Sequence, residues 1–222
     1  KGHSRAMKRL CIAGLLVLLG IISAFGQEKP DALKSYRQGR NLEAVGRMED
    51  AKVAYAEAIE ICKQDLADND KNMEAYTIYG WSLLRMGKNR EAVDLCQEAL
   101  KIANDYRIVE TMAEGYFYLG NYKESLRHME RYVDAAPRGE RISTAYFFIG
   151  EIYRITRQYN RSDIAYTAAV HLEPAIALWW FRLGSVREEV GDKTGASDAY
   201  RRALNLRPDY KDATEGLKRV RT

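Results

Sequence analysis

The chain has 222 residues, of which 46% are hydrophobic and 30% are charged, and it contains only four prolines. This composition is ordinary for a folded globular protein and excludes a disordered, low-complexity or collagen-like chain. Four of the 35 basic residues and none of the 31 acidic ones lie in residues 1–26, so the formal net charge of +4 belongs to that segment. Residues 27–222 therefore lack the basic excess that nucleic-acid binding or charge-driven membrane binding would require.

Residues 7–26 have the pattern of a secretory signal peptide. Two basic residues precede an uninterrupted apolar run over residues 10–22, which is short for a membrane span. Ala24 and Gly26 then supply the small residues that a signal peptidase needs. We expect cleavage after Gly26, with residues 1–6 as an upstream extension, and export to the periplasm or outer envelope of a bacterium. A buried helix or an uncleaved anchor is the alternative.

A repeat with a period of 34 residues occupies the C-terminal part of the chain. The segment WFRLGSVREEVGDKTGASDAYRRALNLRP, from Trp180, aligns with YFFIGEIYRITRQYNRSDIAYTAAVHLEP, from Tyr146. An aromatic residue, a Leu/Ile–Gly pair, a small residue, Tyr, Ala and Pro coincide at the same offsets. Such a period is typical of a unit that buries its apolar face only against its neighbours.

These offsets resemble the signature of the tetratricopeptide-repeat family over nearly all of residues 27–222. The resemblance is weaker in the first and third units, where Ser35 and Val109 replace the opening aromatic residue. It implies an all-α, right-handed α-solenoid of about five helix–turn–helix units followed by a C-terminal capping helix at residues 211–222. The units are expected at residues 32–65, 73–105, 106–139, 143–176 and 177–210. The second helix of the first unit is expected to run on towards Leu66.

Small residues recur at the centre of each first helix, where they allow two helices to approach closely. This position holds Gly39, Gly80, Ala113, Gly150 and Gly184, and the corresponding aromatic position of the second helix holds Tyr55, Cys96, Met129, Tyr166 and Tyr200. Between the two helices, Gly46, Gly87, Gly120 and Gly191 are expected to adopt the left-handed conformation. Arg157 takes that place in the fourth unit and makes a tight turn less expected there.

The resemblance also implies a concave groove lined by the first helix of each unit. Aromatic anchors beside hydrogen-bonding charges are typical of peptide-binding surfaces, and both recur on the predicted groove face. The candidate partner-binding residues are Trp81, Arg107, Glu114, Phe117, Tyr118, Phe147, Glu151, Arg154 and Phe181. Other groove-facing positions include Tyr36, Glu74, Thr77 and Glu110. We therefore expect an exported scaffold that binds a segment of an envelope protein or peptide.

Three alternatives to this scaffold remain open. The aromatic rings could pack on one another and hold the curvature of the solenoid. The groove could bind a small hydrophobic ligand, or the protein could be an accessory subunit of a periplasmic solute transporter. The aromatic face could also mediate self-association. The Lys and Asn set with which some family members grip a C-terminal carboxylate does not match this register, so that mode is not expected.

The order of the aromatic residues in ALWWFRLG predicts their roles. Trp180 holds the aromatic position of the family and is expected inside its unit. Phe181 is expected to face the groove, and Trp179 to face either the neighbouring unit or a convex edge.

The sequence contains no pattern of a catalytic or metal centre. Its histidines, His3, His128 and His171, have no cysteine or carboxylate cluster at metal-ligand spacing, and phosphate-loop, GxSxG and HExxH motifs are absent. We expect no enzymatic activity, no metal and no cofactor. Cys62 and Cys96 could form a disulfide in an exported protein or be two small buried side chains.

Overall fold

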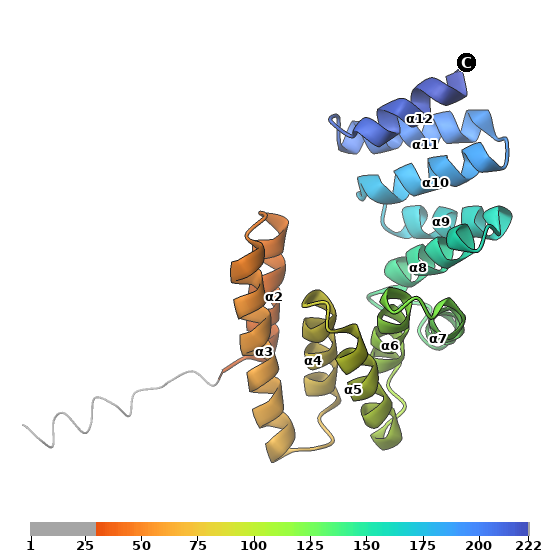
Figure 1. Ribbon diagram of the computed structural model, residues 1–222. Coiled ribbons are helices and arrows are strands. Elements are labelled where there is room, and N and C mark those ends of the chain that lie inside the picture. The colour runs from red at the N-terminus through yellow and green to blue at the C-terminus, as the bar shows by residue number, and fades with distance from the viewer. Residues whose placement is uncertain (1–29, 222) are drawn as a thin grey trace, which may run out of the picture. The chain divides into compact units, whose positions relative to one another are not determined.

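A computed structural model describes residues 30–221 (Figure 1), so the predicted signal peptide and its cleavage site lie outside the described residues. The described residues form eleven helices and no strand. The helices are α2 (Ala32–Ala44), α3 (Met48–Asp68), α4 (Met73–Arg85), α5 (Asn89–Ile102), α6 (Tyr106–Tyr118), α7 (Tyr122–Ala135), α8 (Ile142–Ile155), α9 (Tyr159–Leu172), α10 (Ala177–Glu189), α11 (Lys193–Leu206) and α12 (Lys211–Arg221). The prediction that α3 extends beyond its repeat length is confirmed.

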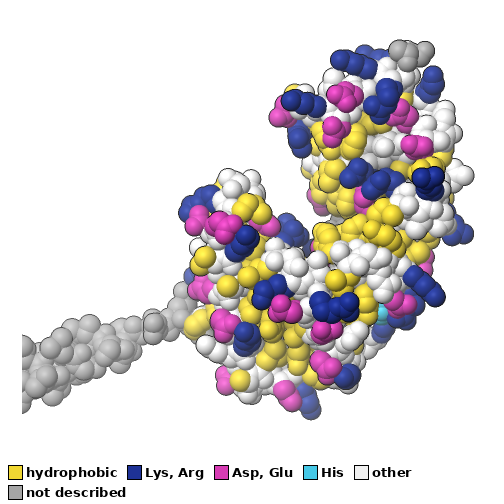
Figure 2. Space-filling view, viewed as in Figure 1, with side chains coloured by type: hydrophobic (Ala, Val, Ile, Leu, Met, Phe, Trp, Pro, Cys, Tyr) yellow, Lys and Arg dark blue, Asp and Glu magenta, His cyan; other side chains and the backbone are white. Residues whose placement is uncertain are grey.

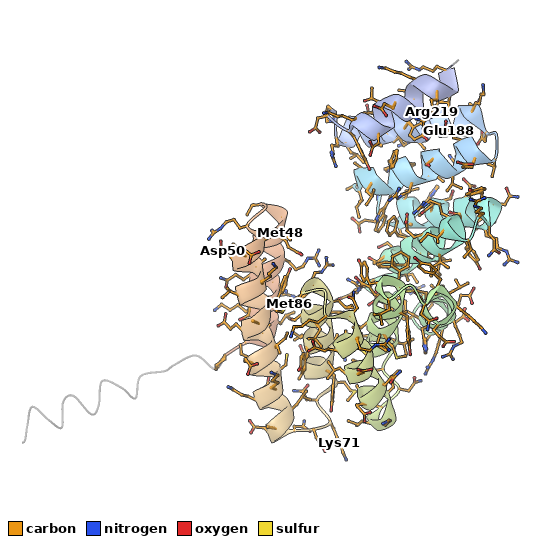
Figure 3. All side chains as sticks on the ribbon, viewed as in Figure 1. Met48, Asp50, Lys71, Met86, Glu188 and Arg219 are labelled. Carbon is orange, nitrogen blue, oxygen red and sulfur yellow. The ribbon has the colours of Figure 1, made fainter. Side chains whose placement is uncertain are left out.

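The helices pack as consecutive pairs. The pairs α2–α3, α4–α5, α6–α7, α8–α9 and α10–α11 are here called units one to five, and the second helix of each unit also packs on the first helix of the next. The predicted all-α solenoid of helix–turn–helix units with a C-terminal capping helix is confirmed. Helix α12 is that cap: Arg219 donates hydrogen bonds of 2.7 and 2.9 Å to Glu188 of α10 (Figure 3).

The turns inside the units have left-handed backbone conformations. The glycines between the two helices have φ between 73° and 83°. Arg157 has φ 59°, so unit four makes the same turn and the expectation drawn from its missing glycine was wrong. The turn closes because Gln158 N donates to the Tyr153 carbonyl at 2.8 Å. The exposed Arg157 tolerates a conformation that costs a non-glycine residue about 1–2 kcal/mol.

Complementary sizes hold the two helices of each unit together. A Cβ atom on Gly150 would lie 2.6 Å from the Tyr166 ring, and one on Gly184 would lie 2.7 Å from the Tyr200 ring. The second helix therefore places its ring directly on the backbone of the first. Where the first helix carries Ala113 instead, its unit has a flexible methionine in place of the ring.

Each of these buried rings also carries a hydroxyl group that needs a partner. Tyr55 donates to Glu43 at 2.8 Å, Tyr200 donates to Glu188 at 2.7 Å, and Tyr166 donates to Glu151. In all three units the acceptor lies on the first helix, so the hydrogen bond ties the same two helices that the ring packs between.

Serine at the small position of the second helix adds a further tie. The Ser125 hydroxyl donates to the Ala113 carbonyl, and the Ser162 hydroxyl donates to the Gly150 carbonyl, both at 2.8 Å. Both hydroxyls are buried and satisfied, so serine replaces alanine there without an unpaired polar group.

The spacing between successive first helices depends on different side chains along the solenoid. Helices α4 and α6 approach closely, since a Cβ on Gly80 would lie 2.8 Å from the Thr111 methyl group. Aromatic rings fill the later spaces. The ring centroids of Phe117 and Phe148 are 4.9 Å apart, and those of Phe147 and Trp179 are 5.1 Å apart with nearly parallel planes.

Of the neighbouring tryptophans of α10, Trp179 is the more buried. Trp179 is buried against Phe147 of unit four, which settles its direction towards the neighbouring unit. Trp180 is only half-buried: it packs on its own unit, its indole N–H donates to the Pro174 carbonyl at 2.8 Å, and Arg202 lies over its ring. Trp179, which contacts the neighbouring unit, is therefore more buried than Trp180, which packs within its own unit.

The two cysteines of the described residues are both buried and free. They lie in different units, Cys62 on α3 and Cys96 on α5. Burial raises the pKa of the Cys62 thiol to about 12, which leaves little of the reactive thiolate. Of the two interpretations of this pair, the structure supports two small buried side chains.

Replacing Gly150 by alanine is expected to lower the free energy of unfolding by about 1–3 kcal/mol, because the added methyl group overlaps the Tyr166 ring. Alanine otherwise favours a helix over glycine by about 1 kcal/mol, so a net loss reports the overlap. In a Tyr166→Met background, which copies the Ala113–Met129 combination of unit three, the same replacement should cost less. Urea unfolding followed by circular dichroism measures both costs. Equal costs in the two backgrounds would contradict the contact.

Candidate functional site

A cavity of about 390 Å³ opens between the first helices of units one to three, and we call it the N-terminal pocket. Helices α2, α4 and α6 line it, together with Tyr132 of α7 and the connection that precedes α8. Its lining comprises Leu33, Tyr36, Arg37, Glu74, Thr77, Ile78, Trp81, Tyr106, Arg107, Glu110, Tyr132, Glu140 and Arg141. Of the nine candidate binding residues, Trp81 and Arg107 are the ones that line this pocket.

A buried carboxylate and a guanidinium form the inner end of the pocket. Glu110 is only 1% exposed, and its Oε1 lies 2.8 Å from Nε of Arg141. Arg141 also pairs with Glu114, and its guanidinium lies 6.0 Å from the centre of the Trp81 ring. One guanidinium therefore serves two buried carboxylates and an aromatic face.

Burial dominates the chemistry of Glu110. Loss of solvent raises the pKa of its carboxyl to about 7, although the charge of Arg141 lowers it and that of Glu114 raises it further. Both Glu110 oxygens, Arg141 Nε and the indole nitrogen of Trp81 are buried without a hydrogen-bond partner in the described part of the chain, although Glu110 Oε1 and Arg141 Nε form an ion pair. A buried acceptor and a buried donor thus remain unsatisfied in residues that line one pocket, an arrangement that calls for a bound group or water.

The rim of the pocket is charged. Asp105 caps α6 by accepting from the backbone N–H of Arg107 at 2.8 Å, and it pairs with the Arg107 side chain at 2.7 Å. Burial opposes ionisation of Asp105, but the hydrogen bonds from Arg107 hold its pKa below the usual range. The remaining charged side chains of the rim, Arg37, Glu74 and Glu140, are exposed. The Arg107 charge is therefore already balanced within the protein.

Glu114 and Tyr118 line a second, shallower pocket of about 290 Å³ with Glu43 and Arg85. Arg85 lies 3.9 Å from Glu43, and Glu114 is engaged by Arg141. Phe117 lines neither of these pockets. It packs on Tyr118 and on Phe148, with ring centroids 5.6 and 4.9 Å apart.

The charged candidate residues of α8, Glu151 and Arg154, form contacts within the chain. Glu151 is 6% exposed and accepts the Tyr166 hydroxyl. Its two oxygens pair with Arg154 at 2.7 Å and with Arg182 at 2.9 Å. Glu151 thus accepts hydrogen bonds from Tyr166 and Arg154 and also forms an ion pair with Arg182, whereas the one ion pair given for Glu110 among the described residues is with Arg141.

The candidate rings of α8 and α10 also contact other rings. Phe147 stacks on Trp179, and Phe181 packs against Tyr210 and Tyr200 with centroids 5.0 and 6.0 Å apart. Both phenylalanines are half-buried. On the face that Figure 2 shows, hydrophobic side chains gather over α8–α10 with charged side chains among them.

Tyr106, Tyr132 and Arg141 are among the residues of the N-terminal pocket that the sequence did not place in the groove. Tyr106 and Tyr132 belong to positions that the repeat register assigns to the start of a first helix and to a second helix. Arg141 lies in the connection between α7 and α8, outside any helix. The hydrogen bond from its backbone N–H to the Tyr132 hydroxyl at 3.2 Å shows how the connection folds back onto the unit. No periodic signal could have indicated that contact.

The described part of the chain was also compared with the requirements of a metal site and of a membrane span. In residues 30–221, no three or more His, Cys, Asp and Glu side chains are grouped so that they could hold a metal ion. None of the helices that the structure describes combines the length and apolar character required of a membrane span.

Two family profiles, both described as tetratricopeptide repeat, match residues 31–105 and 156–211, together more than half of the chain. The chain belongs to the tetratricopeptide-repeat family, as its sequence predicted. This fold supports a role as a protein–protein interaction scaffold.

Two curated relatives are distant and much longer than the matched region. Protein O-mannosyl-transferase TMTC1 of Homo sapiens is 25% identical over 171 residues, which cover 75% of this chain and 19% of the relative. The Mus musculus protein of the same name is 26% identical over 140 residues, which cover 61% and 14%. The match thus spans less than a fifth of each relative's length.

Similar solved structures include MamA 41-end from Desulfovibrio magneticus RS-1, with a TM-score of 0.60 and 22% identity over 82% of this chain and 99% of that one. Another is YrrB, described as a tetratricopeptide-repeat protein with an unusual peptide-binding site, with a TM-score of 0.56 and 19% identity over 89% and 97%. At these identities the likeness shows a shared fold.

The Glu110 carboxyl should make the folded chain less stable as pH rises from about 5 to 8. Its pKa is raised in the folded state to about 7, so folding favours the protonated form and this advantage is lost as pH rises through that value. In urea unfolding, Glu110→Gln should therefore gain stability relative to wild type over this range.

Comparison with wild type at each pH cancels the contribution of His128, whose pKa burial lowers to about 4. Glu188→Gln is the control, because the Arg219 hydrogen bonds lower the pKa of Glu188 and place its titration below this range. A difference between Glu110→Gln and wild type that does not change with pH would contradict the assignment.

Proposed function

We propose that this chain is a non-enzymatic scaffold that binds a segment of a protein partner in the N-terminal pocket. The observation that carries the proposal is the pair of unsatisfied buried groups, Glu110 Oε2 and the Trp81 indole nitrogen, in the lining of a cavity of about 390 Å³. A cavity of this size falls within the range of about 300–1,000 Å³ typical of ligand sites. Tryptophan and arginine, which both line it, are the residues most enriched at binding hot spots.

The same geometry favours a polar segment over a small hydrophobic ligand. Six charged side chains line the N-terminal pocket, namely Arg37, Glu74, Arg107, Glu110, Glu140 and Arg141. An apolar ligand would leave the buried Glu110 acceptor unpaired, at a cost of about 1–3 kcal/mol or more. The peptide-binding site named for YrrB, which has a similar fold, supports a peptide as the ligand class.

We assign Phe117, Phe147 and Phe181 chiefly to packing along the solenoid, since each already contacts other rings of the chain. Glu151 and Arg154 likewise form an ion pair with one another. The partner segment would then engage Trp81 and Arg107 directly and run over the remaining groove residues as a surface that excludes water.

The pocket can be tested by selecting linear peptides from a random phage library on the purified chain. Trp81→Ala should weaken binding of the selected peptides at least about thirtyfold, the loss expected for a hot-spot residue. Trp180→Ala is the matched control, because it removes another half-buried indole far from the pocket, and it should change affinity less than about twofold. Peptides that bind Trp81→Ala as well as wild type would place binding elsewhere.

We also propose that the chain is exported to the periplasm or outer envelope of a bacterium, where its partner would be an envelope protein. The basic start, apolar run and small residues of residues 7–26 support this. Expression of the full chain in a Gram-negative bacterium should yield a periplasmic product that begins at Gln27, as measured by intact-mass spectrometry. Replacing Ala24 and Gly26 by arginine should retain the longer chain at the membrane. An uncleaved, cytoplasmic wild-type chain would refute export.

A further inference from the structure

We propose that the N-terminal pocket recognises a cationic side chain, the ammonium of lysine or the guanidinium of arginine, on the partner segment. This inference rests on the proposed function and adds the chemistry of the residue that anchors the partner. Three independent features of the pocket support it: the charges at its rim, its aromatic rings and its unsatisfied atoms.

The charges at the inner end of the pocket are balanced. Glu110 and Glu114 share the single guanidinium of Arg141. Glu43 has two cations, Arg40 at 3.6 Å and Arg85 at 3.9 Å, so three guanidiniums face three carboxylates there.

Among the described residues at the rim of the pocket, unpaired carboxylates outnumber unpaired cations. Arg107 is held by Asp105 at 2.7 Å. Glu74 and Glu140 have no ion pair within 4.0 Å among the described residues, and the single rim cation without one is Arg37. A cation at the mouth of the pocket therefore meets these two carboxylates against one arginine.

Two pairs of aromatic rings line the pocket. The centroids of Tyr36 and Trp81 are 5.5 Å apart, and those of Tyr106 and Tyr132 are 6.1 Å apart. Ring faces attract a desolvated cation by up to about 2 kcal/mol. Tyr106 is 46% exposed, so its ring stands at the mouth, where an incoming side chain would meet it first.

The unsatisfied atoms match a basic residue of an extended segment. Glu110 Oε2 is a buried acceptor and can receive an N–H of an ammonium or guanidinium, a charge-assisted bond that is stronger than a neutral one. The Trp81 indole is a buried donor and can reach a carbonyl of the same segment. Arg141 engages Glu110 through Oε1 and leaves Oε2 for the ligand.

The test uses capped pentapeptides with a central lysine, arginine, norleucine or glutamate between alanines. Binding is followed through the indole N–H signals of ¹⁵N-labelled protein, which has three tryptophans, with the Trp81 signal assigned by Trp81→Phe. The lysine and arginine peptides should shift this signal saturably and bind at least about tenfold more tightly than the norleucine peptide, which has a similar apolar chain without the charge. The glutamate peptide should cause no shift.

Glu110→Gln should abolish the preference for lysine over norleucine, while Glu188→Gln, a carboxylate of unit five outside the pocket, should retain it. If Glu110→Gln does not fold, the comparison of the four peptides on wild type decides alone. Equal affinity for lysine and norleucine peptides would overturn the cation site but leave peptide binding, and hence the proposed function, intact. If no pentapeptide shifts the Trp81 signal while the library-selected peptides still bind, the cation site is refuted and the proposed function stands.

Discussion

The contact between a second-helix ring and the backbone of the first helix sets the geometry of units four and five, and the rest of the structure follows from it. The Tyr166 ring reaches the α8 backbone only because Gly150 has no side chain. That approach brings the tyrosine hydroxyl within hydrogen-bonding distance of Glu151 on the same first helix. The carboxylate is thereby held on the surface that faces neighbouring first helices, where it pairs with arginines. The close contact between ring and backbone inside one unit thus positions the carboxylate that forms an ion pair between units.

The same plan has different consequences at the two ends of the solenoid. In units four and five, stacked rings such as Phe147 and Trp179 occupy the space between first helices, and Glu151 has two hydrogen-bond donors and an ion pair with Arg182. In units two and three, the small Gly80 and Thr111 bring α4 and α6 close together, and Glu110 is left with one cation. The N-terminal pocket therefore combines a buried carboxylate that has one ion pair with an indole N–H that has no hydrogen-bond partner among the described residues. A carboxylate oxygen that already accepts a hydrogen bond gains little from a partner, whereas a buried oxygen without one gains more.

Membership of the tetratricopeptide-repeat family explains the fold but does not specify the ligand, which depends on the particular side chains that line the pocket. The curated relatives share less than a fifth of their length with this chain, and the similar solved structures are related at about 20% identity. Repeat families keep the residues that join helices and vary those that face the groove. The properties of Glu110, Arg141 and Trp81 therefore carry the specific argument about binding.

The amino-acid sequence by itself determined the helices, the pairing of helices in units and the capping helix. Those features depend on local periods, on turn residues and on the size of side chains at fixed offsets, all of which can be counted along the chain. It also indicated Trp81 and Arg107 as groove residues. Only the tertiary structure decided that Trp179 is more buried than Trp180 and that Arg157 adopts the left-handed turn conformation that glycine has in the other units. It also decided that Arg141, in the connection between α7 and α8, pairs with both Glu110 and Glu114. These outcomes depend on which atoms meet across units and loops, and contacts between residues distant in sequence follow no period.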